Sequence, residues 1–430
     1  MKTVKKGAGP GPFLLAALVF LLAASLLLSP KTVVVASTAG AKLWWEVVFP
    51  SLLPFFICAK LLMALGVVQF LGVLVEGLMR PLFAVPGPGA FVMLMGFGSS
   101  YPMASILATD LLRRGECTVA EAERMVTYFT TADPLFLSGA VAVGMLSRPD
   151  LAPVLVGSHY VAALVVALAA ARLAPAAART WKEPPWPSPV RAGAALLESR
   201  RRDGRPFGRI LGDAVQESVN TLLIIGGLIM LFSVLAAILD QVGLFSPLAH
   251  LAGAIVAPLG LPAVTGRAVA MGVFEVTIGA RAAAGLAAPV DLQVVAIAFI
   301  MAWGGFSIHA QVASIVQGTG IRLGPVLLAR AAQAALAALF ARWLLASPAA
   351  MDIVSKVMVP PHGLTALGAL GGSYSPLGDL AASVGAGTGA EVFLSNLVGS
   401  LWGALEMGTL WLLLVGLYLA VGGRRQRASH

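Results

Sequence analysis

Long apolar runs are the feature that most limits what this chain of 430 residues can fold into. Clear examples cover residues 13–28, 154–171 and 410–421. A helix needs roughly 20 mostly apolar residues to cross a bilayer. Only 11% of the residues are charged, against about 25% in a soluble domain. Strands of a membrane barrel would alternate apolar and polar residues, whereas the apolar residues here form blocks. The pattern predicts an all-α, polytopic membrane protein and argues against a soluble enzyme.

The positive charges are unevenly placed, and this predicts which segments face the cytoplasm. The net charge is +9, and basic residues gather near the N-terminus, in the middle of the chain and after residue 423. Clusters of Lys and Arg mark cytoplasmic segments of membrane proteins. We therefore expect both termini and the central basic segment to be cytoplasmic. Topology explains the charge better than nucleic-acid binding does, and no nucleic-acid partner is expected.

Composition divides the chain into six predicted parts. These are an N-terminal tail with a first transmembrane helix (1–42), a first repeat (43–173), a basic cytoplasmic linker (174–209), a second repeat (210–346), an extramembrane loop (347–397) and a C-terminal transmembrane helix with a basic tail (398–430). The basic start and apolar stretch could also be a cleaved signal peptide. A further helix expected from Leu43 favours a retained anchor, which we expect to cover residues 13–36.

The two halves share a pattern of breakers and caps. Proline, glycine and capping positions recur at offsets of 171 to 177: Pro81 with Pro258, Pro86 with Pro262, Gly96 with Gly272, the capping-box residue Thr118 (with Glu121) with Asp291, and Asp133-Pro134 with Gly304-Gly305. Such constant spacing indicates a duplicated unit. The first copy would begin outside, after one crossing, and the second at the cytoplasmic linker. The sequence therefore predicts an inverted-topology repeat, as in many secondary transporters with broken helices.

One pair of predicted breaks lies at residues 98–102 and 274–279. A helix broken inside a membrane leaves backbone groups unpaired, at several kcal/mol each unless protein, water or a ligand satisfies them. Glycine and serine alone could instead allow close helix packing, but a carboxylate in the break favours function. The candidate substrate-binding residues here are Ser99, Ser100, Tyr101, Glu275 and Thr277, with Arg281 placed to meet an anion or to pair with Glu275.

The other pair of predicted breaks lies at residues 130–134 and 303–311. Freed N–H groups after each break could hold an anion at a helix N-terminus. His309 could donate to a carboxylate or take a proton, or could be a packing residue, and Asp133 could simply cap the following half-helix. The candidates here are Thr131, Asp133, Gly304, Gly305, Ser307, His309 and Gln311.

Motifs of catalysis do not support an enzyme. The sequence lacks a GxxxxGK[ST] phosphate loop, an HExxH pair, a GxSxG elbow and a CxxC pair. We therefore expect no catalytic residues, metal or organic cofactor, and no ATP-driven pumping. The expected partners are the lipid bilayer and a small anionic substrate. The coupling ion (H⁺ or Na⁺) and a homo-oligomer or spore-assembly partner stay open.

Several stretches resemble one family. VVFPSLLPFFI, MRPLFAVPGPGAFVMLMGFGSSYP, ADPLFLSGAVAVGM, GSHY and WGGFSIHAQVASI are similar to the sporulation integral membrane protein family YlbJ, also called stage V sporulation protein V, which carries the Gate, or nucleoside-recognition, repeat. The resemblance covers about residues 43–346. Where the family would have Gly-Tyr-Pro and Ser-Gly-Pro, this chain has Ser100-Tyr101-Pro102 and Ala132-Asp133-Pro134, which changes residues expected to contact substrate.

The resemblance implies an endospore former, a place in the outer forespore membrane and movement of dipicolinic acid during sporulation. Dipicolinate is a small planar dianion, which helix N-termini, hydroxyls, an Arg or a protonated His could bind while Tyr101, Trp303 or Phe306 stacks on its ring. The expected mechanism is alternating access around the paired breaks. Two rival hypotheses stay open: an ion-coupled nucleoside transporter, and a non-transporting membrane scaffold for spore envelope assembly.

Overall fold

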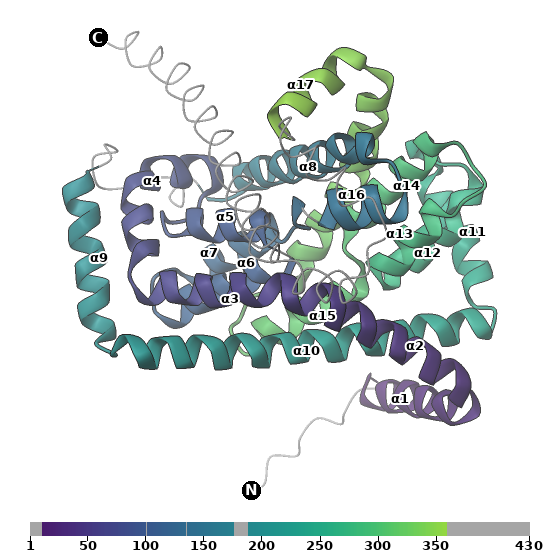
Figure 1. The fold of residues 1–430 in the computed structure, drawn as a ribbon, viewed down its shortest axis with the longest axis horizontal. Helices are drawn as coiled ribbons and strands as arrows, with labels where there is room; N and C mark the ends of the chain where they lie inside the picture. The colour runs from purple at the N-terminus through teal and green to yellow at the C-terminus, as the bar shows by residue number, and fades with distance from the viewer. Residues whose placement is uncertain (1–10, 100, 135, 176–187, 359–430) are drawn as a thin grey trace, which may run out of the picture.

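The computed structural model describes residues 11–99, 101–134, 136–175 and 188–358, and within these ranges the chain is helical without strands (Figure 1). Four helical segments are long and apolar enough to cross a membrane: Pro149–Arg172, Phe207–Gln241, Val290–Val316 and Leu323–Ala346. Two bent helix pairs, Val19–Leu28 with Pro30–Glu46 and Leu52–Ala64 with Val67–Phe83, would raise the number to six. The predicted all-α, polytopic fold class is confirmed.

The helices fall into two consecutive groups. The first comprises α1 (Gly11–Leu28), α2 (Pro30–Leu43), the π-helical turn η1 (Trp44–Val48), α3 (Phe49–Ala64), α4 (Val67–Phe83), α5 (Gly89–Gly98), α6 (Tyr101–Arg113), α7 (Val119–Phe129), the π-helix η2 (Phe136–Met145), η3 (Pro149–Leu151) and α8 (Ala152–Arg172). The second comprises α9 (Pro189–Asp203), α10 (Phe207–Gln241), α11 (Phe245–Val256), η5 (Ala257–Leu259), η6 (Ala263–Thr265), α12 (Gly266–Phe274), α13 (Val276–Ala284), α14 (Val290–Trp303), α15 (Gly305–Val316), α16 (Leu323–Ala346) and α17 (Pro348–Met358).

The N-terminal helices differ from the prediction. The helix expected over residues 13–36 ends at Leu28, and the chain bends by 103° before α2. Pro30 explains the restart, because proline has no N–H to donate and its fixed φ suits the first position of a helix. From there the chain stays helical through η1 into α3, without the loop expected before Leu43. The π-helical turn directly precedes Pro50, whose missing N–H removes one helical hydrogen bond.

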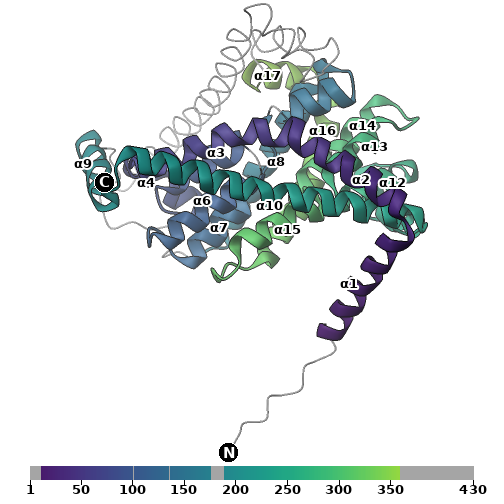
Figure 2. The same cartoon turned by 60° about the horizontal axis from the view of Figure 1, so that its bottom comes forward.

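The order of elements recurs between the halves, as a duplicated unit predicts. α4, α5, α6, α7, η2 and α8 correspond to α11, α12, α13, α14, α15 and α16. The contacts between the halves pair corresponding elements. α3 packs on α10 and α8 on α16, α6 of the first half packs on α15 of the second, and α13 of the second half packs on η2 of the first. The α3 and α10 helices run side by side in both views (Figures 1 and 2). The two halves are therefore interlocked, and the inverted threading stays a prediction.

The segments predicted outside the membrane are partly described. Residues 188–209 form α9, which packs on α4, and the start of α10. At the end of α9 the Arg205 guanidinium donates to Asp203 at 2.7 Å, and this hydrogen bond holds the pKa of that carboxyl below its usual range. Residues 348–358 of the predicted loop form α17, which packs on α8. The rest of that loop and the predicted C-terminal helix lie outside the described residues.

Candidate binding site at four helix breaks

All four predicted interruptions are present. α5 ends before Ser99, α7 ends before residues 130–134, Glu275 separates α12 from α13, and Gly304 separates α14 from α15. Local chemistry explains the last two. Glu275 is extended, with φ −143° and ψ 121°. Gly304 and Gly305 have φ values of +87° and +79°, which glycine adopts without the steric penalty of other residues. The sequence therefore stops each helix through backbone geometry or a capping side chain.

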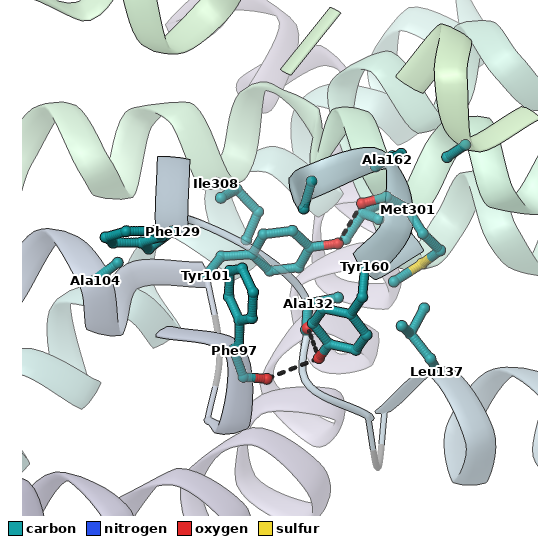
Figure 3. Packing of buried hydrophobic residues seen from close by; sticks show 14 of the residues in the cluster. Phe97, Tyr101, Ala104, Phe129, Ala132, Leu137, Tyr160, Ala162, Met301 and Ile308 are labelled. Atoms are coloured by element: carbon teal, nitrogen blue, oxygen red, sulfur yellow. Dashed lines mark hydrogen bonds between the residues drawn. The ribbon is translucent and has the colours of Figure 1, made fainter. Parts of the chain in front are cut away.

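The two breaks of the first half are tied together. Thr131 donates its hydroxyl to the Gly96 carbonyl oxygen at 3.1 Å. The Tyr160 hydroxyl lies 2.7 Å from the carbonyl oxygens of both Phe97 and Ala132 (Figure 3). The Nε2 atom of His159 accepts a hydrogen bond from the Ala132 N–H at 3.2 Å. Backbone groups that the breaks would leave unpaired are thus satisfied by side chains of α8.

The second half uses the same arrangement with different residues. Trp303 Nε1 donates to the Val273 carbonyl oxygen at 3.3 Å, and Val273 corresponds to Phe97 of the first half at the offset of 176 that relates Gly96 to Gly272. Gly305 lies so close to the other break that a Cβ there would stand 3.1 Å from the Gly272 oxygen. In both halves an aromatic donor therefore takes the carbonyl freed at the first break.

Contacts between the halves join these two pairs into one cluster. Tyr101 donates its hydroxyl to the Met301 carbonyl oxygen at 2.5 Å, just before the Gly304 break (Figure 3). Arg330 of α16 donates to the carbonyl oxygens of Thr130 and, at 3.0 Å, Thr127, at the end of α7. These contacts bring the four breaks together in the buried interior.

The helices that begin at the breaks differ in their capping. The Asp133 carboxylate accepts from the Phe136 N–H at 2.7 Å at the start of η2. The Glu275 carboxylate accepts from the Ile278 N–H at 2.8 Å and from the Thr277 hydroxyl at the start of α13. By contrast, α6 follows two serines, and α15 follows Gly304 with no side-chain cap. α13 contacts η2, and we call this contact the carboxylate-capped crossing because both helices start with a carboxylate cap. α6 contacts α15, and we call this contact the carboxylate-free crossing.

Polar atoms without partners lie near the carboxylate-free crossing. Within the described residues, Ser99 Oγ, Ser307 Oγ, His309 Nε2 and Gln311 Nε2 are buried and make no hydrogen bond. Ser307 and Gln311 share one face of α15, since they are four residues apart, and helical side chains lean toward the helix N-terminus. Unpartnered donors and an uncapped helix N-terminus together make a site suited to an anion.

Other predicted site residues have different surroundings. Arg281 lies in the last turn of α13 with an exposed side chain, and in the described part of the chain it forms no ion pair with Glu275. The hydroxyl groups of Tyr101 and Thr131 donate hydrogen bonds to backbone carbonyl oxygens. Asp133 caps the next half-helix, which is one of the two roles that the sequence left open. Ser100 lies outside the described residues.

Sequence reasoning missed four buried residues of α8 and α16. Besides His159 and Tyr160, these are Arg330 and Gln333, whose amide donates to the His159 carbonyl oxygen at 3.2 Å. Arg330 carried a usable signal, because a charged residue within an apolar span is a functional candidate by default. Tyr160 and Gln333 carried none, since such residues are common at helix interfaces.

A cavity lies beside the Gly304 break, and a cluster of ion pairs lies near the linker. A cavity of about 430 Å³ is lined by apolar side chains of α10, α12, α15 and α16, with His309 on its wall: Phe232, Leu235, Phe274, Phe306, Ala310, Val312, Ala313, Leu323, Val326 and Leu327. Next to the linker, Lys60 of α3 forms ion pairs with Asp110 of α6 at 2.5 Å and Glu217 of α10 at 2.8 Å. These charges join elements from both halves.

The fold and the cluster of breaks define a multi-pass integral membrane protein of transporter-like architecture. Comparison with known proteins agrees. The Gate family, described as nucleoside recognition, matches residues 45–173. The sporulation integral membrane protein YlbJ of Bacillus subtilis (strain 168) is 39% identical over 330 residues, which are 76% of this chain and 81% of that protein. The chain belongs to the YlbJ family of sporulation integral membrane proteins.

Proposed function

We propose that the chain is a transporter that moves a small aromatic dicarboxylate, dipicolinic acid, across the outer forespore membrane during sporulation. The name of its Bacillus relative supports the link with sporulation. The resemblance of the motifs supports the substrate and the membrane. Both termini are proposed to be cytoplasmic, from the distribution of basic residues.

The observation that carries the proposal is the carboxylate-free crossing. Two half-helices begin there without an acidic cap, and the Ser99, Ser307 and Gln311 side chains have buried polar atoms without partners. Leaving such groups unsatisfied costs about 1–3 kcal/mol each, so a ligand that accepts their hydrogen bonds recovers this energy. A carboxylate supplies several acceptor positions and no donor, and it is attracted by the helix N-termini.

Alternating access follows from how the crossings are built. Besides the packing of α3 on α10 and α8 on α16, the halves contact each other at the breaks through side-chain hydrogen bonds such as Tyr101 to Met301. A movement of one half against the other would change those contacts, while the hydrogen bonds within each half would stay intact. Such rocking around a fixed midplane site is the general mechanism of repeat-built transporters, and no covalent chemistry is required.

Uptake by proteoliposomes of the full chain tests the proposal. Vesicles with the wild-type chain should accumulate dipicolinate with saturation, and Ser307→Ala combined with Gln311→Ala should abolish it. A matched control is Ser25→Ala, which alters a half-buried serine of α1 whose hydroxyl donates to the Leu21 carbonyl oxygen of the same helix. The Gate description as nucleoside recognition favours a nucleoside transporter as the second candidate. Saturable uptake of uridine without dipicolinate would establish that candidate instead.

The scaffold hypothesis is separated by a spore assay. Ser99→Ala, Glu275→Gln and His309→Ala should each lower spore dipicolinate at unchanged protein level. Normal dipicolinate in all three variants would contradict transport through this site and favour a scaffold.

A further inference from the structure

Arg330 is a buried cation with an unusual set of partners. Its side chain is 1% exposed, and its guanidinium donates to the carbonyl oxygens of Thr127 and Thr130. The Nε donor has no partner. Among the described residues, no carboxylate lies within ion-pair distance of this guanidinium. Arginine stays charged in proteins, so the interior contains a positive charge that no carboxylate of residues 11–99, 101–134, 136–175 or 188–358 neutralises.

Other partly buried cations of the chain are paired differently. Lys60 contacts two carboxylates, those of Asp110 and Glu217, and Arg80 contacts those of Glu76 and Glu121. For Arg330 the nearest compensation is the C-terminal end of α7, which carries roughly half a negative charge as a helix dipole. Since an uncompensated buried charge is strongly unfavourable, and the described residues supply no carboxylate to it, the site is suited to a bound anion.

The position of Arg330 connects it with the breaks and with the apolar cavity. Leu323, Val326 and Leu327 of α16 line that cavity, and Arg330 follows them at helical spacing on the same stripe. Through its hydrogen bond to the Thr130 carbonyl oxygen, it lies at the break that follows α7. His309, which follows the break at Gly304, lies on the cavity wall. An aromatic anion in the cavity would thus have apolar side chains around its ring, with the Arg330 cation one helical turn along α16 from Val326 and Leu327.

We propose that Arg330, and not the exposed Arg281, is the fixed positive charge that binds the transported carboxylate, and that it makes the site selective for anions over neutral molecules of the same shape. The inference rests on the proposed transport function and deepens it. The Nε donor and the guanidinium charge act on the ligand, while the remaining N–H groups hold the end of α7 in place. Arg330 is therefore both a ligand-binding residue and a link between α16 and the break after α7.

Selectivity tests this proposal, because a structural role alone would weaken all ligands equally. The full chain in nanodiscs is titrated with dipicolinate, with the monoanion picolinate and with the neutral diamide of dipicolinic acid, and binding is followed by the shift in thermal unfolding. Arg330→Gln should weaken dipicolinate binding by about 10- to 100-fold, as loss of a charge-assisted hydrogen bond predicts, and should change diamide binding little. Arg330→Lys should fall between. Arg281→Gln is the matched control and should bind dipicolinate as the wild type does.

The outcomes distinguish failure of the proposed transport function from failure of the assignment of Arg330. If wild-type vesicles transport no dipicolinate but anions stabilise the chain and Arg330→Gln removes the effect, the proposed function fails and the assignment of Arg330 stands. An unchanged ratio of dianion to diamide affinity in Arg330→Gln overturns the assignment, and so does a wild-type chain that no carboxylate stabilises. Comparison of unfolding without ligand shows how much Arg330 contributes to the fold alone.

Discussion

The contact of the two second-half breaks can be tested by adding one methyl group at Gly305. Its φ is +79°, and an alanine Cβ there would stand 3.1 Å from the Gly272 oxygen, 3.1 Å from the Val276 nitrogen and 3.2 Å from the Phe274 oxygen. All three are backbone atoms, which cannot rotate away. The left-handed conformation costs about 1–2 kcal/mol and overpacking typically adds about 1–3 kcal/mol. We expect Gly305→Ala to destabilise the chain by about 2–5 kcal/mol.

Two other glycines provide graded controls. Gly304 has φ +87°, but its nearest neighbour would be 3.4 Å away, at the Tyr101 ring. Gly304→Ala should therefore show the backbone strain alone, about 1–2 kcal/mol. Gly227 of α10 has helical geometry and open space around the added methyl group. Gly227→Ala should stabilise by about 0.5–1 kcal/mol.

The assay is thermal unfolding of the purified full chain in one detergent, followed by loss of the monodisperse size-exclusion peak. The expected order of midpoints is Gly227→Ala, wild type, Gly304→Ala and Gly305→Ala, from highest to lowest. If Gly305→Ala unfolds at or above the temperature of Gly304→Ala, the two breaks do not touch as described, and the reasoning about a shared cluster is refuted.

Further predictions use the same unfolding assay. Tyr160→Phe deprives two buried carbonyls of their shared hydroxyl and should destabilise by about 1–3 kcal/mol; an unchanged midpoint would mean that another donor reaches them. Glu275→Ala removes the cap of α13 and should cost about 0.5–2 kcal/mol, whereas Glu275→Gln keeps an acceptor oxygen and should cost less; equal losses would contradict a capping role. Lys60→Met leaves the partly buried Asp110 carboxylate and the exposed Glu217 carboxylate without their cation and should cost about 1–3 kcal/mol, with part of the loss restored by adding Asp110→Asn. Failure of that rescue would show that the pair contributes nothing.

The breaks could be predicted because their causes are local. Glycine with positive φ, a proline and a carboxylate that caps the next helix all act within a few residues of themselves. The capping box is the plainest example: Thr118 accepts from the Glu121 N–H at 3.3 Å, and Glu121 accepts from the Thr118 N–H at 2.8 Å, as predicted. The bend at Pro30 was missed, although Ser29, Pro30 and Lys31 end the apolar run of residues 13–28 and proline is common at the first position of a helix.

The partners of the breaks could not be predicted, since they come from distant parts of the chain. Tyr160 reaches Phe97 across 63 positions, and Arg330 reaches Thr130 across 200. Nothing in the hydropathy of α8 or α16 shows which carbonyl a side chain will meet, because that depends on how the helices pack. For the same reason the sequence pointed to Arg281, the cation nearest to a break along the chain.

The distribution of acidic caps has a consequence for how such a protein could arise. Each half contains one half-helix that starts with a carboxylate and one that starts without it, in opposite order. In a symmetric dimer of either half, a half-helix that starts with a carboxylate would meet one that starts without it. The dimer would contain two such crossings, and they would be equivalent. Two copies that have diverged within one chain can instead place both capped half-helices at one crossing and both half-helices without a carboxylate at the other. A single anion-binding crossing therefore requires divergence after duplication.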